Sequence, residues 1–342
     1  MFRKSTILKF SLLTALTFLA AAAASAQSGA LWQRGDPTDG SAPKGATSVA
    51  SDDDTASPRP EGDMSWGVTL KQRGMLGNLG YWMTDTSLDI AAPYGVDLNA
   101  DLNDFGNSTS SASPTVTMGA GWTNGISAYT ASYAVTTLAN NYQANALDLG
   151  VSVKMDSLNF RTLLSLDVNE THHRNYAYIG HPVTHAPARK DEEDLSECTP
   201  TASLSQRLFG NFDAKITLAQ SIYNQSIVTY TNTLGRTKTA GQRAFAREDS
   251  DLTGLIVGFP DWSAKFGVNY DFDAVPLTLR GTYENIALED TGQGTNTTAA
   301  VMTYAADYDV KKWATLTASY EHTRQTSQPQ TDEYGAQLTL RY

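Results

Sequence analysis

Apolar and polar residues alternate along most of this chain from residue 64 onward. In residues 147–155, "LDLGVSVKM", every odd position is apolar and the even positions are Asp, Gly, Ser and Lys. Residues 158–168 repeat the pattern, and Asp156-Ser157 between the two segments suits a tight hairpin turn. Because successive side chains of a strand point to opposite faces, the pattern predicts antiparallel strands with one apolar and one polar face.

Three features favour a membrane-spanning barrel over a soluble β-sandwich. The predicted strands are about ten residues long or longer, which crosses a bilayer when tilted, whereas sandwich strands average about five or six. Charges of both signs recur on the polar faces, as in a water-filled lumen. Aromatic residues gather near strand ends, as in the two aromatic girdles of a membrane barrel. They are Trp122, Tyr129, Tyr133, Tyr223, Trp262, Tyr270, Tyr283, Tyr308, Trp313 and Tyr320.

The chain ends in "YGAQLTLRY", residues 334–342, with apolar or aromatic residues at alternate positions and an aromatic residue last. This ending, with the alternation before it, resembles the Gram-negative outer-membrane β-barrels. The resemblance covers residues 64–342 and implies that Tyr342 belongs to an assembly signal, read by the barrel-assembly machinery. It also implies that the last strand pairs with the first, which removes the sheet edges that lipid cannot hydrate.

The N-terminal residues predict two further segments. Arg3, Lys4 and Lys9 accompany a short apolar run that ends at a small-residue cleavage site, so residues 1–26 are predicted to be a secretory signal peptide. Residues 27–63 are rich in Pro, Gly, Ser, Ala and Asp, and we expect a disordered periplasmic or exported linker. Residues 64–342 would then form the barrel, in the cell outer membrane.

Counting back from Tyr342 with short periplasmic turns and longer outer loops predicts an all-β, up-and-down barrel of about twelve strands. The expected turns are "TNG", "DS", "FG", Asp273-Ala274 and Lys311-Lys312. One strand is expected within residues 64–90; two strands around "RGMLGN" and one further change would give the alternative count of fourteen. The later strands are expected at 115–122, 126–138, 144–155, 158–170, 199–208, 211–223, 251–272, 276–288, 297–309, 313–324 and 332–342.

Pro260-Asp261 allows two interpretations. A hairpin turn there would invert the orientation of all earlier strands. We prefer a single long strand that is bulged near Pro260 and projects above the membrane, because Leu252, Ile256 and Trp262 keep one phase across the break.

The predicted function is porin-like passage of small hydrophilic solutes through the lumen. Charged residues at polar strand positions are predicted to line the lumen. They would either form the wall of an open channel or close the lumen by pairing with one another. The alternative is a non-conducting structural or adhesion barrel that binds a partner through its outer loops. The predicted lumen-lining residues are Lys154, Arg161, Asp167, Arg207, Asp213, Lys215, Arg280, Glu284 and Glu321.

Two predicted outer loops carry candidate chemistry. Residues 171–198 contain His172, His173, His181 and His185, which are weak candidates for Zn²⁺, Cu²⁺ or Ni²⁺ ligands; a solvated loop is the better interpretation. Opposite charges in the loops 171–198 and 224–250 are expected to face each other over the mouth and to screen solutes. These mouth residues are Asp191, Glu192, Glu193 and Asp194 in one loop, and Arg236, Lys238, Arg243 and Arg247 in the other.

Composition and motifs exclude several other classes. Without its first three cations the chain has 22 Lys and Arg against 36 Asp and Glu, which argues against a nucleic-acid partner. One cysteine, Cys198, rules out an internal disulfide or a thiolate-clustered metal site. No GxSxG, HExxH or phosphate-binding loop is present, and His322, on the predicted lipid face, has no serine partner there. We therefore expect no enzyme and no cofactor; the expected partners are membrane lipid, small hydrophilic solutes and, in a homo-oligomer, further copies of the chain.

Overall fold

The structure is a computed structural model that describes residues 66–78, 81–107, 115–139, 142–157, 160–179, 189–209, 211–227, 244–245, 256–257, 259–289, 297–326 and 330–342. The predicted signal peptide and linker, residues 1–63, lie outside this range. Within it, no helix has the length and apolar character needed to span a membrane.

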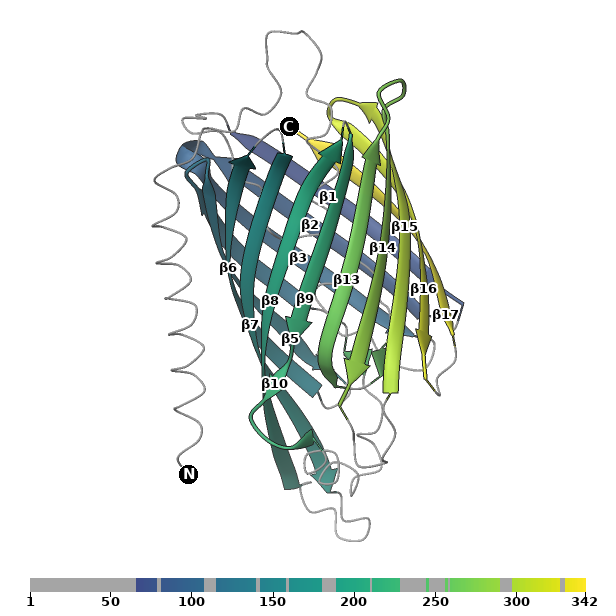
Figure 1. The fold of residues 1–342 in the computed structure, drawn as a ribbon. Coiled ribbons are helices and arrows are strands. Elements are labelled where there is room, and N and C mark those ends of the chain that lie inside the picture. The colour runs from purple at the N-terminus through teal and green to yellow at the C-terminus, as the bar shows by residue number, and fades with distance from the viewer. Residues whose placement is uncertain are drawn as a thin grey trace.

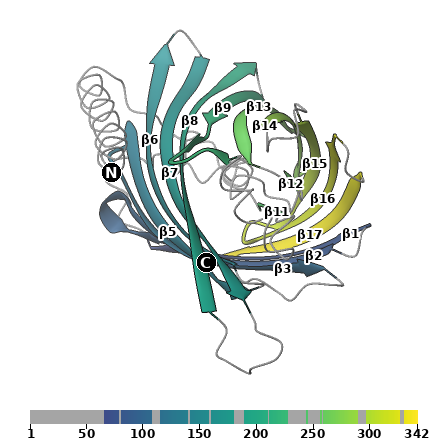
Figure 2. The same ribbon diagram turned by 90° about the horizontal axis from the view of Figure 1, so that it is seen from below.

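One antiparallel sheet closes on itself as a barrel (Figures 1 and 2). The first strand pairs with the last, from Thr69 opposite Arg341 to Gly77 opposite Glu333, so the wall has no free edge there. The wall strands are β1 Gly67–Gly77, β2 Tyr81–Ala92, β3 Val96–Asn107, β4 Thr115–Thr123, β5 Ser127–Ala139, β6 Tyr142–Ser157, β7 Phe160–Ile179, β8 Arg189–Phe209, β9 Phe212–Gln220 continued by β10 Ile222–Tyr223, β13 Pro260–Asp271, β14 Leu277–Leu288, β15 Thr297–Lys311, β16 Ala314–Gln325 and β17 Thr331–Arg341. The prediction of an antiparallel, up-and-down transmembrane barrel is confirmed.

The outer surface of the barrel is apolar and aromatic. In β3, for example, Leu98 and Leu102 are 46% and 49% exposed, whereas Asp97 and Asn99, on the other face, are half-buried. Aromatic rings pack against one another across this surface: Trp122 stacks on Tyr129 with ring centroids 5.7 Å apart. Such a band suits contact with lipid hydrocarbon and its interfaces.

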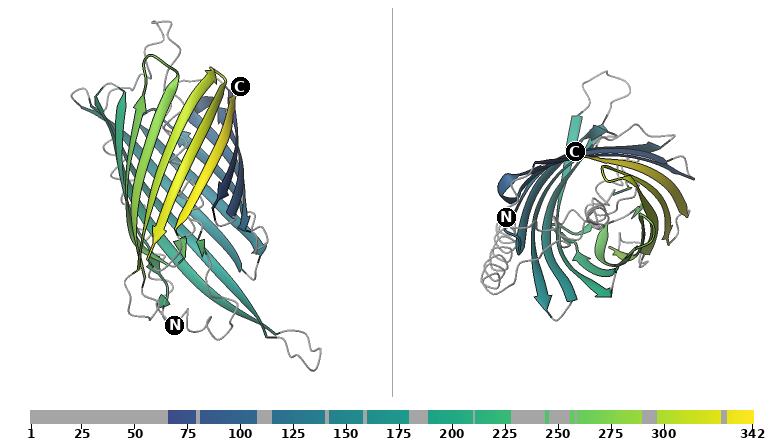
Figure 3. Two further views of the ribbon diagram at one scale, coloured as in Figure 1. Left: turned by 90° about the vertical axis from the view of Figure 1, so that its right-hand side faces the viewer. Right: turned by 90° about the horizontal axis from the view of Figure 1, so that it is seen from above.

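The turns at the two ends of the barrel differ in length. At the end where the C-terminus lies, the links are short: the 3₁₀ turn Pro93–Gly95, the turn after Thr123 and the links after Ser157, Phe209, Asp271 and Lys311 (Figure 3). In the first of these, Tyr94 and Gly95 both have positive φ angles, which reverses the chain sharply. The predicted periplasmic turns at "TNG" and "FG" coincide with these links, whereas Asp156-Ser157 is still paired in β6, and the link follows it.

The count of twelve strands is wrong, and the alternative count of fourteen is confirmed. The difference lies before residue 108, where three strands, β1, β2 and β3, stand in place of one. β3 was missed because its sequence, "VDLNADLNDFGN", is rich in Asp and Asn, residues that are rare in strands. Asp97, Asn99, Asp101 and Asn103 nevertheless fall on one face, where a water-filled lumen accepts them, and Asp104 is the exception near the end of the strand.

The prediction of an outer loop over residues 171–198 is also wrong in part. β7 runs on to Ile179 and β8 begins at Arg189, and the two remain paired from Arg161 opposite Arg207 to Ile179 opposite Arg189. This hairpin extends beyond the end of the barrel (Figure 1). The ladder continues because backbone pairing satisfies the N–H and C=O groups as well in water as in the wall.

The bulge near Pro260 is confirmed. The register between β13 and β14 shifts between Pro260 and Trp262, and β13 continues without a hairpin to Asp271. The prediction that this strand extends without interruption before Pro260, above the membrane, is wrong. Ile256–Val257, strand β12, pairs instead with β11, Ala244–Phe245, in a separate small sheet that Figure 2 shows inside the ring of wall strands.

Candidate functional site

The inner face of the barrel is the candidate functional site, and the register identifies it. In β14, Leu279 and Tyr283 are 43% and 45% exposed on the outer surface, whereas Arg280 and Glu284 on the other face are 7% and 5% exposed. Residues that pair across neighbouring strands share a face, so the closed ring of pairings carries this assignment around the whole barrel. The inner face contains charged or other polar side chains on every wall strand.

A buried ion pair joins β14 to β15. Arg280 Nε lies 2.8 Å from Asp307 Oδ2, and Arg280 Nη2 donates to Asp307 Oδ1 at 3.0 Å. Thr317 on β16 donates a further hydrogen bond to Asp307 Oδ1 at 2.6 Å. The pair therefore fastens three strands through one carboxylate.

A second bidentate pair lies beside the turn between β8 and β9. Arg207 donates from Nε and Nη2 to the two oxygens of Asp213, both at 2.9 Å. This planar, two-pronged arrangement is the strong form of an arginine–carboxylate contact. It fixes the angle between two strands at the short-turn end.

On β1 and β2 the inner face carries two more ion pairs. Arg73 Nη2 lies 3.3 Å from Asp85 Oδ2, and both side chains are mostly buried. Lys71 Nζ lies 3.3 Å from Asp89 Oδ2, where the side chains are more exposed. The two pairs join β1 to β2, next to the β1–β17 seam that closes the barrel.

Carboxylates predominate at one level of the inner face. Glu321 lies directly opposite Glu333, and both are 1% exposed. Thr303 and Thr323 donate to the two oxygens of Glu321 at 3.4 and 3.2 Å. Because both side chains are almost fully buried, these two carboxylates are shielded from solvent in the lumen.

The remaining predicted lumen residues lie on the same inner face. Lys154, Asp167 and Lys215 are half-buried, and Arg161 is exposed at the start of β7. That these residues line an open channel remains a prediction.

Sequence reasoning missed further charges on this face. Lys71, Arg73, Asp85 and Asp89 belong to strands that it did not separate. The alternation placed Asp148, Lys265, Asp307 and Glu333 at polar positions of predicted strands, but they were not included among the predicted lumen-lining residues.

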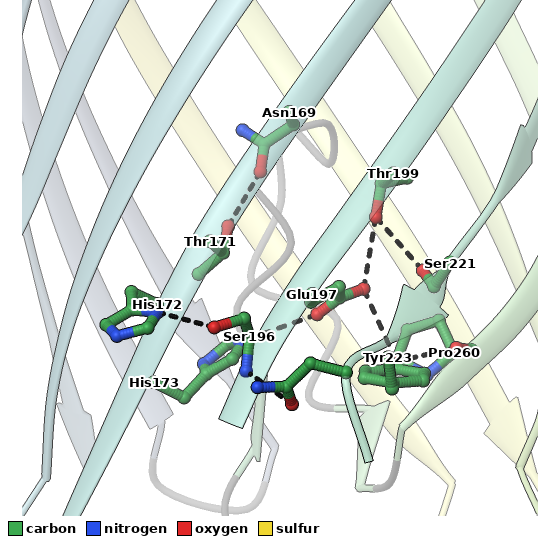
Figure 4. A network of polar contacts seen from close by, with 11 residues as sticks. Asn169, Thr171, His172, His173, Ser196, Glu197, Thr199, Ser221, Tyr223 and Pro260 are labelled. Atoms are coloured by element: carbon green, nitrogen blue, oxygen red, sulfur yellow. Dashed lines mark hydrogen bonds and ion pairs between the residues drawn. The ribbon is translucent and has the colours of Figure 1, made fainter. Parts of the chain in front are cut away.

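At the outer end, a polar network ties β8 to β7, β10 and β13 (Figure 4). His173 Nε2 lies 3.2 Å from Glu197 Oε2, and Thr199 donates to Glu197 Oε1 at 3.1 Å. The Tyr223 hydroxyl lies 3.3 Å from Glu197 Oε1 and donates to the carbonyl oxygen of Pro260 at 2.6 Å. Glu197 thus joins strands that are far apart in the sequence.

This network lies at the outer edge of the apolar band. Of the outward-facing side chains at its level, Glu170, His172 and Ser196 are polar, and Ile222 is apolar. The pKa of Glu197 is lowered: burial opposes its charged form, but the hydrogen bonds and charge of His173 and the hydrogen bonds of Ser221 and Thr199 outweigh it. Burial, followed by the nearby Glu197 carboxylate, raises the pKa of Tyr223.

The structure does not bring the histidine candidates together within the described residues. His172 and His173 are neighbours on β7 and point to opposite faces: His172 Nδ1 meets Ser196 Oγ at 2.6 Å, whereas His173 meets Glu197. His181 and His185 lie outside the described residues. Among the residues that are described, no group of three or more His, Cys, Asp or Glu is placed to hold a metal ion.

Of the predicted mouth residues, the structure describes the side chain of Asp194. Asp194 is exposed on β8, and Arg174 Nε lies 4.0 Å from its Oδ1. The side chains of Asp191, Glu192 and Glu193, and all of Arg236, Lys238, Arg243 and Arg247, lie outside the described parts of the chain. That the charged segments 171–198 and 224–250 face each other over the mouth of the barrel therefore remains a prediction.

His322 lies on the outer face, in the phase predicted for it. Its Nδ1 lies 2.8 Å from Asp332 Oδ1, and the Tyr320 hydroxyl donates to the same oxygen at 2.7 Å. Tyr320 packs against Tyr304 and Tyr334 with ring centroids 6.4 and 5.2 Å apart. The histidine thus forms part of an aromatic and polar rim.

The sequence matches no family model and no curated protein sequence. Its structure is similar to those of OccK1 (OpdK) from Pseudomonas aeruginosa, with 9% identity over 81% of this chain and 98% of that chain and a TM-score of 0.41. It is similar to OccAB1 from Acinetobacter baumannii, with 10% identity, 82% and 99% coverage and a TM-score of 0.42. It is also similar to a loop-deletion mutant of OmpT, an outer membrane protein of Vibrio cholerae, with 9% identity, 81% and 98% coverage and a TM-score of 0.40.

Proposed function

We propose that this chain is an outer-membrane channel that lets small hydrophilic solutes pass by diffusion. One observation carries the proposal: the barrel closes with large apolar side chains exposed outside and charged side chains of both signs inside. Lipid satisfies the first surface, and water or a polar solute suits the second.

The size of the barrel and its small inner residues support a bore. Barrels of about eight strands have interiors that side chains can fill, and diameter grows with strand number. The inner positions of β4, β5 and β6 include Gly119, Gly121, Ser132 and Gly150, whose small side chains let Asn99 and Asp167 lie close to the wall. A chain of fourteen strands with such a wall suits a channel better than a solid barrel.

The same geometry supports the proposed partners. The exposed apolar band would contact membrane lipid, and the terminal strand β17 would be the segment that the barrel-assembly machinery recognises. Assembly into a homo-oligomer would bury part of the apolar band and leave the lumen intact. Transport through the lumen needs neither an enzyme nor a cofactor.

Recordings in planar lipid bilayers test the proposal. Purified, folded protein should insert in discrete current steps, whereas the heat-denatured protein should not. Folding is verified on the same sample by a heat-modifiable band in gel electrophoresis. Folded protein that inserts into vesicles but passes neither ions nor small sugars would refute the channel function.

A further inference from the structure

We propose that a notch in the outer rim of the barrel, between β10 and the start of β13, binds a neutral sugar through Asp261, Glu289 and Gln225. The proposal rests on the channel function above and names a class of solute for it, free mono- and disaccharides. The notch would hold these sugars at the mouth of the barrel before they enter the lumen.

The notch exists because two strands of the wall separate at this point. β9 pairs with β13 as far as Gln220 opposite Trp262, and the Ser221 N–H donates to the carbonyl oxygen of Asp261 at 2.7 Å. β10 then pairs with β8 instead. β13 begins at the bulge beside Pro260, and a proline has no N–H to donate to a ladder. A cavity of about 330 Å³ lies where the strands part.

Contacts around the notch fix its shape. The Tyr223 hydroxyl donates to the carbonyl oxygen of Pro260 at 2.6 Å (Figure 4), and the Glu289 N–H donates to that of Phe259 at 2.7 Å. The rings of Tyr223 and Phe259 meet edge to face with centroids 6.1 Å apart, and Ile227 is buried in the same apolar cluster. A site that is formed before the ligand arrives loses less entropy on binding.

The lining of the notch offers both hydrogen-bond donors and acceptors. Asp261 and Glu289 contribute carboxylate oxygens, Gln220 and Gln225 contribute amide groups, and Ser226 contributes a hydroxyl. Sugar hydroxyls also donate and accept hydrogen bonds, so this mixed lining suits a sugar.

A backbone contact orients one of these amides. Gln225 Nε2 donates to the carbonyl oxygen of Asp194 at 2.7 Å, which joins the notch to the projecting part of β8. The amide group also has a second N–H and an oxygen with which to meet a ligand.

The charges around the notch disfavour anions. Asp261 and Glu289 line it, and nearby Glu197 contacts the Tyr223 hydroxyl and has His173 as its partner. No Lys or Arg occurs among the described residues that line the notch. Because this lining carries negative charge only, we expect it to repel an anionic solute.

The donors in the lining favour a sugar over a small cation. A cation needs only acceptors, so it would leave the amide N–H groups and the Ser226 hydroxyl without a partner in the ligand. A sugar hydroxyl can serve both kinds of group. Asp261 and Glu289 can accept such bonds while they keep their other contacts, because a carboxylate has about four acceptor sites.

The size of the notch limits the ligand. Its volume, about 330 Å³, lies near the lower end of the range for small-molecule sites, about 300–1,000 Å³. Ile222, Tyr223 and Ile227 supply apolar surface beside the polar groups, against which the C–H groups of a sugar ring can pack. We therefore expect a mono- or disaccharide rather than a longer chain.

Saturation-transfer difference NMR on the purified, folded protein measures binding independently of transport. D-Glucose should receive saturation from the parent protein. D261N/E289Q should weaken glucose binding by about tenfold or more, because hydrogen bonds to charged groups are the stronger ones. The matched control is E170Q/D273N, which removes the same charge at exposed positions outside the notch and should bind glucose like the parent.

A second variant keeps the test decisive if D261N/E289Q does not fold. Ser226→Phe fills the notch from an exposed position without removing a charge. It should abolish the glucose signal. Unchanged glucose binding in folded Ser226→Phe overturns the proposed site.

Each contrary result identifies which idea has failed. A parent that gives no glucose signal, or that binds putrescine in place of glucose, overturns the assignment to sugars. An equal loss of binding in D261N/E289Q and in its control overturns the location. A parent that binds glucose in the notch but passes neither ions nor sugars in bilayers leaves the site in place and overturns the channel function.

Discussion

Arg280→Met should be among the most destabilising single substitutions on the inner face. The change removes the charged half of the Arg280–Asp307 pair and keeps a flexible side chain of similar length. Asp307 then retains the hydrogen bond from Thr317 but loses both contacts to the guanidinium. A carboxylate would remain at a site where it is only 8% exposed.

The degree of burial determines the magnitude of the loss. The Arg280 and Asp307 side chains are 5% and 8% exposed, and breaking a buried pair by removing one partner costs about 3–5 kcal/mol. The hydrogen bond from Thr317 places the expected loss near the lower end, at about 3 kcal/mol. The matched control is Lys71→Met: its pair with Asp89 is 25% and 41% exposed, and an exposed pair contributes about 0–1 kcal/mol.

Urea titration of folding into lipid vesicles, followed by tryptophan fluorescence, measures both free energies of unfolding. The double variant R280M/D307N, compared with the two single variants, gives the coupling energy between the partners, which should exceed about 1 kcal/mol. Equal losses for Arg280→Met and Lys71→Met, or a coupling energy near zero, would refute the reasoning that burial determines the contribution of these pairs.

Three further predictions concern the outer face, the C-terminus and pH. Leu218→Arg, on the outer face at 55% exposure, should cost about 2–4 kcal/mol in vesicle folding, whereas Thr217→Arg, on the inner face, should cost less; the reverse order would mean that the faces are exchanged. Tyr342→Asp should reduce the amount of heat-modifiable barrel in the outer membrane of cells, and normal amounts would show that the terminal aromatic residue is not part of the assembly signal. The lowered pKa of Glu197 means that its contribution to stability is complete above its ordinary value of 4.5 and is lost as the pH falls through the lower, folded value. Stability should therefore fall more steeply below pH 4.5 in the parent than in Glu197→Gln, and parallel curves would contradict this.

Some features of the fold follow directly from alternation. The assignment of Leu147 and Leu149 to one face and Asp148 to the other needed only the period of two, and the exposures agree with it. The short turns after Thr123, Ser157 and Phe209 were likewise marked by Asn, Ser and Gly residues.

The strand count shows where local patterns fail. β3 obeys the alternation as far as Asn103, but its Asp and Asn residues weaken the strand propensity, and only pairing with β2 and β4 shows that it belongs to the wall. The extension of β7 and β8 beyond the barrel was missed for a related reason: its charges indicated a loop, whereas the backbone ladder continues regardless of side-chain polarity.

The sequence by itself determined that this chain forms long strands with an apolar and a polar face, and hence a barrel whose charges are inside. Only the tertiary structure decided which charges meet. Arg280 and Asp307 are 27 residues apart, and Glu197 and Tyr223 are 26 apart, so no local pattern connects them. The physical reason is that the two faces of a strand follow from the geometry of successive residues, whereas register and closure depend on strands that are distant in the chain.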